Sequence, residues 1–233
     1  MKIIGHRGAR ALSPENTIAG IEKAITHGVA YIEIDVCATK DGVAILHHDP
    51  FLTDPDGSEV IIAQTTYAEL LRHKPDLAAL DYAIRAVQHR CKIMIEIKPG
   101  EPTKQIVSII KDRLQRGWRL SEFSIASYDF GALKQMKEAL PGVELVVNEL
   151  WSGVRACRRA RKLGTKRINM YEQWLYTGYV KMLKRSGYQL AIFPANKPRW
   201  HQRKSHTDSL ARIRSWRPYL YGVITDHPDI FED

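Results

Sequence analysis

Acidic and imidazole side chains are concentrated between Tyr31 and Pro50, in the stretch YIEIDVCATKDGVAILHHDP. Glu33 and Asp35 lie two residues apart in an apolar, β-branched run, so in a strand both carboxylates project from the same face. Paired carboxylates can bind a cation, and histidines exchange protons near neutral pH. The stretch alone does not distinguish a functional site from an ordinary polar face, since acidic side chains are common on exposed strand faces.

The dipeptide Asp41-Gly42 predicts how the two halves of this stretch face each other. It is typical of a two-residue type I′ hairpin turn, and strand-like residues flank it on both sides. Pairing Lys40 with Val43 gives a register in which Asp35 lies opposite His48. We therefore expect a carboxylate and an imidazole to be cross-strand neighbours.

Strand and helix patterns alternate along the rest of the chain. The hairpin arm beginning at Val43 is excluded from the parallel set, because its connection from Val36 is too short for a parallel crossover. Eight strand candidates remain, beginning near Lys2, Tyr31, Lys92, Phe123, Val143, Arg167, Gln189 and Gly222. Eight βα units in 233 residues predict an α/β fold, a (β/α)8 TIM barrel.

The first helix is predicted to begin within Ser13-Pro14-Glu15-Asn16. Ser13 or Asn16 can act as the N-cap, Pro14 and Glu15 suit a first turn, and Gly28 ends the apolar periodicity.

Residues 49–80 break the alternation, being richer in Asp, Pro, Thr and Gly. We interpret them as a small capping insertion after the second strand, at approximately residues 49–80. With 44% hydrophobic residues, the chain can bury one full-sized core, and we expect a single domain over residues 1–233.

The composition indicates a cytoplasmic protein. No apolar run approaches the roughly 18 residues needed to cross a bilayer, and the first residues become polar too soon for a secretory signal. Cys37, Cys91 and Cys157 have no metal-binding spacing, which favours free thiols in a reducing compartment.

Positive charge is concentrated in residues 151–217, which hold 17 Lys or Arg against Glu172 and Asp208. Their local net charge is +15, so of the total of +9 the rest of the chain carries −6. Such asymmetry indicates an anionic partner: a phosphate ester, an anionic phospholipid surface or nucleic acid. Nucleic acid is the partner we expect least, because the basic residues of 155–162 fall around much of a helix, as on a solvated face.

In a TIM barrel the active site lies at the carboxyl ends of the strands. The polar residues predicted at these ends are His6, Arg7, Glu33, Asp35, Glu96, Lys98 and Asn148. Three carboxylates in this set would repel one another unless a cation bound among them. Hard oxygen ligands favour one divalent cation, Mg²⁺ or Ca²⁺.

Seven motifs give the chain a family resemblance: HRG at 6–8, PENT at 14–17, IEIDV at 32–36, TKDG at 39–42, HDP at 48–50, EIKP at 96–99 and TDHP at 225–228. In order and spacing they resemble the glycerophosphodiester phosphodiesterase family, which is PLC-like, over nearly the whole chain. The resemblance implies a TIM barrel and metal-dependent hydrolysis of small-molecule glycerophosphodiesters to sn-glycerol 3-phosphate and an alcohol.

The resemblance also implies roles for individual residues. His6 and His48 resemble the acid–base pair, and Arg7 and Lys98 resemble the phosphate-contacting cations. The residues that resemble its metal ligands are Glu33, Asp35 and Glu96. These roles suit the reaction, because an anionic diester needs charge neutralisation and proton transfer to its leaving alkoxide.

Supporting roles are expected for Glu15, Asn16, His47 and Asn196. Glu15 can orient Arg7 or simply stabilise a helix dipole, and the hairpin register turns His47 away from the face of His48. The seventh strand ends in Ile192-Phe193-Pro194-Ala195-Asn196, in which only the asparagine matches the family's usual tryptophan-threonine-valine-asparagine-like segment.

Two other functions remain open from the sequence. The basic, aromatic loops in the second half favour a lysophospholipase D-type activity on membrane lipids. The charge asymmetry is also compatible with a non-catalytic basic barrel that binds phosphate or nucleic acid.

Overall fold

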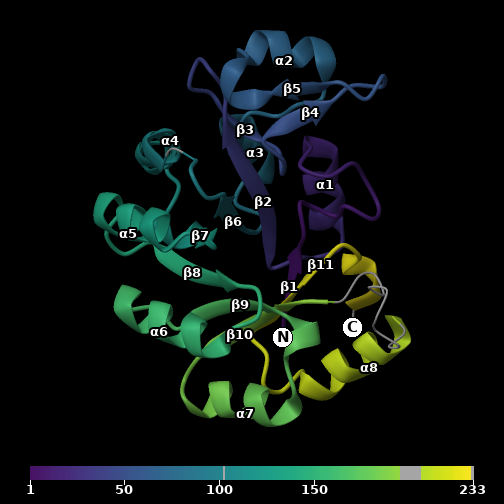
Figure 1. Ribbon diagram of the computed structural model, residues 1–233, viewed down its shortest axis with the longest axis vertical. Coiled ribbons are helices and arrows are strands. Elements are labelled where there is room, and N and C mark those ends of the chain that lie inside the picture. Colours follow the sequence, from purple (N-terminus) through teal and green to yellow (C-terminus); the bar gives the residue numbers. More distant parts are fainter. Residues whose placement is uncertain (102, 195–205, 232–233) are drawn as a thin grey trace.

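The computed structural model describes residues 1–101, 103–194 and 206–231. Its centre is a closed barrel of eight parallel strands (Figure 1). These are β1 (Lys2–Gly5), β2 (Tyr31–Ala38), β6 (Lys92–Ile97), β7 (Phe123–Ser127), β8 (Glu144–Glu149), β9 (Arg167–Tyr171), β10 (Gln189–Phe193) and β11 (Gly222–Thr225). Each strand pairs in parallel with the next, and β1 closes the ring by pairing with both β2 and β11. The predicted TIM barrel is confirmed.

Helices cover the outside of the barrel (Figure 1). They are α1 (Ile18–Thr26), α3 (Leu80–Val87), α4 (Thr103–Gln115), α5 (Phe130–Ala139), α6 (Gly153–Leu163), α7 (Thr177–Arg185) and α8 (His206–Trp216). Each presents an apolar stripe to the sheet; in α3, for example, Leu80, Ala83, Ile84 and Val87 are buried at helical spacing. Short 3₁₀ turns η2 (Leu120–Glu122), η3 (Glu172–Trp174) and η4 (Pro228–Phe231) complete the connections. Among the helices described, none is long and apolar enough to cross a membrane.

A small unit follows β2 and lies at one end of the molecule in Figure 1. It contains β3 (Ala44–Leu46), β4 (Phe51–Thr53), β5 (Glu59–Ile61), η1 (Ile62–Gln64) and α2 (Tyr67–His73). It has its own apolar cluster of Cys37, Ile45, Leu52, Ile62, Leu70 and Leu77. That this unit is an insertion within one domain stays a prediction.

The hairpin register differs from the prediction by one residue. Val36 pairs with Leu46 and Ala38 with Ala44. Thr39 N donates to Val43 O (3.0 Å), and Gly42 has a φ of +80°, so the loop has three residues ending in a left-handed glycine. The prediction that His48 pairs with Asp35 is therefore wrong.

The start of the first helix also differs from the prediction. Thr17 is the N-cap, and its hydroxyl accepts a hydrogen bond from Gly20 N (3.1 Å). Pro14 and Glu15 precede the helix, and the φ of Asn16 is +55°. The assignment of Ser13 or Asn16 as the cap was wrong, because the Asn16 side chain hydrogen-bonds with Asp35 and Thr17 caps the helix instead.

Gly8 determines how the first loop fits against α1. Its φ is +88°, and a Cβ there would lie 2.6 Å from the carbonyl carbon of Gly20. We expect Gly8→Ala to lower the free energy of unfolding by about 2–5 kcal/mol, through backbone strain and overpacking. Gly28→Ala is the control, because Gly28 also has a positive φ (+65°) but no atom within 4 Å of the added Cβ. Urea denaturation should show the larger loss for Gly8→Ala; equal losses would contradict the packing argument.

Candidate active site

Three buried carboxylates meet at the carboxyl ends of β2 and β6. Asp35 and Glu96 are paired neighbours on the two strands, and Glu33 precedes Asp35 on the same face of β2. One oxygen from each lies within 4.8 Å of the others, and the three residues are at most 4% exposed. Parallel pairing of two apolar strands therefore concentrates three acidic groups that could hold a metal ion, and their role as metal ligands stays a prediction.

Glu33 is the member of this acidic cluster with an unsatisfied atom. Its Oε2 accepts a hydrogen bond from the backbone N–H of Arg7 (3.0 Å), whereas Oε1 is buried without a hydrogen-bond partner. Burial, together with the charges of Asp35 and Glu96, raises the pKa of Glu33. A buried carboxylate that lies beside two others and has one unpartnered oxygen fits a cation ligand.

Lys98 bridges two of the three carboxylates. Its Nζ lies 2.6 Å from Asp35 Oδ1 and 2.5 Å from Glu96 Oε1. Burial opposes the charge on Lys98, but the two carboxylates outweigh burial and raise its pKa. For Asp35, burial raises the pKa, and the charges of Lys98 and Arg7 reverse this and lower it. The lysine therefore remains an ammonium ion at the edge of the acidic cluster.

Arg7 reaches the same cluster from the other side. Its Nε lies 3.1 Å from Asp35 Oδ2, and its Nη1 donates to Glu15 Oε1 (2.7 Å). Asn16 binds Asp35 twice, donating from Nδ2 to Oδ2 (3.1 Å) and accepting from the Asp35 N–H (3.2 Å). Glu15 and Asn16 thus lie beside the predicted site residues, and their supporting roles stay predictions.

His6 is oriented by a residue that the sequence analysis did not single out. Its Nδ1 lies 2.5 Å from Asp226 Oδ1, and Phe193 packs edge-on against its ring at 5.7 Å. Burial raises the pKa of Asp226, but the hydrogen bond and charge of His6 outweigh it, so the pKa lies below its usual value. The signal was available, because Asp226 belongs to the TDHP motif at the end of the last strand.

The two adjacent histidines have different surroundings. His48 has a half-exposed ring that contacts Asp49 Oδ1 (2.8 Å), and its charge contributes to lowering the pKa of Asp35. β3 ends at Leu46, so a bend and not the strand register brings His48 near the acidic cluster. The Nε2 of His47 instead lies 3.0 Å from Phe51 O in the small unit, and burial lowers its pKa.

Amides from two further strands complete the floor of the site. Asn148 Nδ2 donates to Glu96 Oε2 (2.8 Å), and Asn169 Nδ2 donates to Asn148 Oδ1 (2.9 Å). The sequence places Asn148 at a strand end but indicates no role for it, and Asn169 carries no sequence signal beyond being a polar residue in an apolar run. Asn196, predicted to support the site, lies outside the described residues.

Asp226→Asn is expected to lower kcat by up to about 100-fold with little change in KM. The amide of asparagine is not an ionised acceptor, so it no longer fixes the orientation of the His6 ring. General acid–base catalysis as a whole contributes about 10²–10⁴-fold, which sets the scale of the loss. Asp229→Asn is the control, since Asp229 pairs with His227 at the surface (3.5 Å). Steady-state kinetics on a soluble diester measure both variants; an unchanged kcat in Asp226→Asn would refute the positioning role.

Known proteins resemble this chain in sequence and in fold. A model of the glycerophosphoryl diester phosphodiesterase family matches residues 6–230. A glycerophosphodiester phosphodiesterase of Bacillus altitudinis is 27% identical over 160 residues, which are 63% of this chain and 65% of that relative's length. YhdW of Bacillus subtilis is 26% identical over an alignment covering 98% of this chain and 96% of its own length.

A solved structure shows the same fold. The phosphodiesterase OLEI02445 of Oleispira antarctica, in complex with the product sn-glycerol-3-phosphate, superposes with a TM-score of 0.79 at 22% identity. The superposition covers 98% of this chain and 94% of that one. Because the family model spans nearly the whole sequence, the chain belongs to the glycerophosphoryl diester phosphodiesterase family.

Proposed function

We propose that this protein hydrolyses small glycerophosphodiesters to sn-glycerol 3-phosphate and an alcohol. The observation that carries the proposal is the joint position of three buried carboxylates, two cations and an Asp226-oriented histidine at one end of the barrel. Family membership supports the reaction type, and the product bound to the Oleispira antarctica relative supports the substrate class.

One divalent cation fits the acidic cluster. Glu33, Asp35 and Glu96 would hold it, and the unpartnered Oε1 of Glu33 is the atom that otherwise has no favourable contact. When bound, such a cation neutralises charge on the phosphate oxygens. The all-oxygen ligand set favours Mg²⁺ or Ca²⁺.

The cations and histidines of the chain carry the remaining chemistry. Arg7 and Lys98 lie beside the carboxylates and can contact the nonbridging oxygens of the phosphate. The ionised Asp226 accepts from the Nδ1–H of His6, which leaves Nε2 as the ring atom that exchanges a proton with the substrate. His48 supplies the second proton-transfer group, so one histidine activates the nucleophile and the other protonates the leaving alkoxide.

The nucleophile is either water or the free hydroxyl beside the phosphate in the glycerol group, which would form a cyclic phosphate first. Release of glycerol 3-phosphate from glycerophosphocholine and glycerophosphoethanolamine tests the reaction. Phosphorus NMR during turnover separates the two routes, because the cyclic phosphate would appear before the monoester. No release from any diester in the presence of Mg²⁺ or Ca²⁺ would refute the proposed function.

Lysophospholipase D-type activity is the second candidate, and the exposed tryptophans after β8 and β9 favour it. Turnover of lysophospholipid micelles but not of soluble diesters would establish this alternative. A non-catalytic basic barrel, in contrast, gives no reason to bury three carboxylates together, because each buried charge lowers stability.

A further inference from the structure

Exposed apolar side chains are unevenly distributed over the described residues. Seven large hydrophobic side chains are exposed there, and five of them fall between residues 151 and 182. Trp151 is 59% exposed, Val154 80%, Trp174 48% and Tyr176 67%. Single exposed apolar residues are ordinary on protein surfaces, but a local concentration of this size indicates an interaction surface.

These side chains come from neighbouring connections at one end of the barrel. Trp151 follows β8 and Trp174 follows β9, so both lie at the carboxyl-terminal end of the barrel, which is the end where the acidic cluster lies. Tyr179 of α7 packs so closely on Gly153 of α6 that no Cβ would fit there, and its ring lies 6.0 Å from that of Tyr176. The first turns of α6 and α7 therefore contact each other at this end of the barrel.

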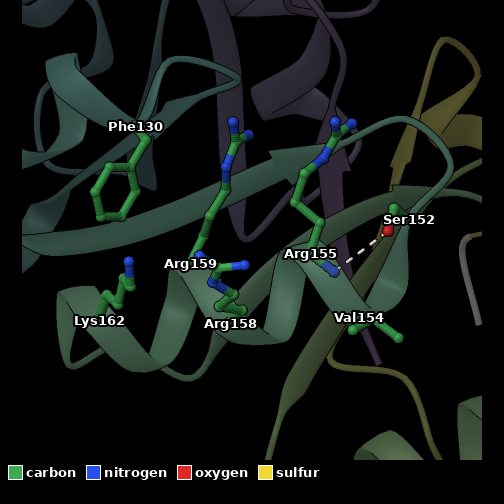
Figure 2. A pocket seen from close by; sticks show the side chains of 7 residues that line it. All are labelled: Phe130, Ser152, Val154, Arg155, Arg158, Arg159 and Lys162. Carbon is green, nitrogen blue, oxygen red and sulfur yellow. Dashed lines mark hydrogen bonds between the residues drawn. The ribbon is translucent and has the colours of Figure 1, made fainter.

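Basic side chains of α6 adjoin these exposed side chains. A cavity of about 440 Å³ is lined by Phe130, Ser152, Val154, Arg155, Arg158, Arg159 and Lys162 (Figure 2). Arg155 binds Glu149 through two hydrogen bonds of 2.6 Å, and Arg159 donates to Tyr128 O (3.1 Å). Figure 2 shows both guanidinium groups extending away from Val154, across the neighbouring strand.

Arg158 and Lys162 differ from these two arginines in having no partner for their charge among the residues that the structure describes. Within the described part of the chain, neither makes a hydrogen bond or an ion pair, and both are exposed one helical turn apart on α6. Val154 precedes Arg158 by four residues, so apolar and cationic side chains share one helical face. Two uncompensated cations share this face with exposed Val154, and exposed Trp151 precedes Val154 by three residues. Such a combination has the chemistry of a membrane-interface surface.

We propose that this surface docks the protein on anionic phospholipid membranes. It is called the rim surface and consists of Trp151, Val154, Arg158, Lys162, Trp174 and Tyr176. The aromatic side chains enter the headgroup layer, and the two cations contact lipid phosphates. Docking itself does not depend on catalysis. Docking would bring the barrel mouth to lipid-derived diesters, and this purpose rests on the proposed function.

Co-sedimentation with vesicles tests the proposal. One set of vesicles contains phosphatidylcholine alone, and the other contains phosphatidylcholine and phosphatidylserine in equal amounts. We expect binding to the anionic vesicles, weakened by salt. Arg158→Gln combined with Lys162→Gln should reduce the partition coefficient by roughly 25-fold, since each basic side chain near an anionic surface contributes about a factor of five. Trp151→Ser combined with Trp174→Ser should also reduce it.

Matched control variants remove the same kinds of side chain from other parts of the protein surface. Lys23→Gln combined with Lys111→Gln removes two exposed charges from α1 and α4, and Tyr82→Ser removes an aromatic side chain that is 54% exposed. Both controls should bind like the wild type. Equal loss in the controls, or an unchanged partition coefficient in the Arg158/Lys162 variant, would overturn the proposal.

Two further measurements separate the possible causes of failure. Turnover of soluble glycerophosphocholine should be unchanged in every rim-surface variant, so lost docking with retained turnover supports the rim surface independently of catalysis. If the wild type binds anionic vesicles but hydrolyses no diester, the proposed function fails while the rim surface stands. Binding to a short DNA duplex without binding to anionic vesicles would overturn the membrane assignment.

Discussion

His48→Ala and His6→Ala are each expected to lower kcat for glycerophosphocholine by about 10²–10⁴-fold, the usual contribution of a general acid or base. The two rings come from different parts of the chain: His6 directly follows β1 and is held by Asp226, whereas His48 lies in the bend after β3. If the two act as a pair, the double variant should lose little more than either single variant, because removing one partner already stops the coupled proton transfers.

His47→Gln is the matched control for these variants. Its ring nitrogen lies 3.0 Å from Phe51 O, so its substitution should affect mainly the local stability of the small unit. Steady-state kinetics and a thermal melt on all variants separate the two effects. Full activity in His48→Ala would refute the assigned acid–base pair.

Removal of divalent cations is expected to lower turnover by roughly 10³-fold and to lower the melting temperature as well. A cation neutralising phosphate charge is worth several kcal/mol in the transition state, or roughly 10³-fold in rate. A cation at 100 times its Kd stabilises the fold by about 2.7 kcal/mol, which corresponds to several degrees in Tm. Dialysis against chelator followed by add-back of Mg²⁺ or Ca²⁺ measures both effects and identifies the preferred ion.

Glu33→Gln gives this prediction a readout that does not depend on activity. Without metal, the variant should be more stable than the wild type, because it removes one of three mutually repelling buried carboxylates. Added metal should raise its Tm less than that of the wild type. A variant that is less stable without metal and still shows the full metal-induced shift would contradict the assigned ligand.

Glu149→Gln is the matched control, since Glu149 is also buried at a strand end but is paired with Arg155. It should lose stability, because the arginine loses its ionised partner, and it should keep the metal-induced shift in Tm. The opposite signs expected at Glu33 and Glu149 separate an acidic metal site from burial of a carboxylate in general.

The barrel was predictable because each strand is a short apolar run with polar residues at its end. The Lys92 run, for instance, became β6 and brought Glu96 level with Asp35, because the parallel pairing aligns Lys92 with Tyr31 at the start of both strands. The position of the acidic cluster was predictable for the same reason, because its carboxylates lie on these strands. Local sequence therefore determined the part of the site that is built directly on strands.

The remaining contacts depend on geometry that local sequence does not specify. The register of the hairpin depended on one left-handed residue, Gly42, and a loop of three residues instead of two moved the pairing by one. Asparagine is a residue type that often caps a helix N-terminus, yet the side chain of Asn16 forms two hydrogen bonds with Asp35. Such choices are made by tertiary contacts, which override intrinsic propensity.

The bond between His6 and Asp226 joins residues 220 positions apart in the sequence. It forms where β11 pairs with β1, so the histidine acquires its orienting carboxylate only when these two strands pair. A chain emerging from the ribosome could bring the three carboxylates together while β11 was still unsynthesised. In the proposed mechanism, His6 would then be oriented only at ring closure, so activity would also report that the barrel has closed between β1 and β11.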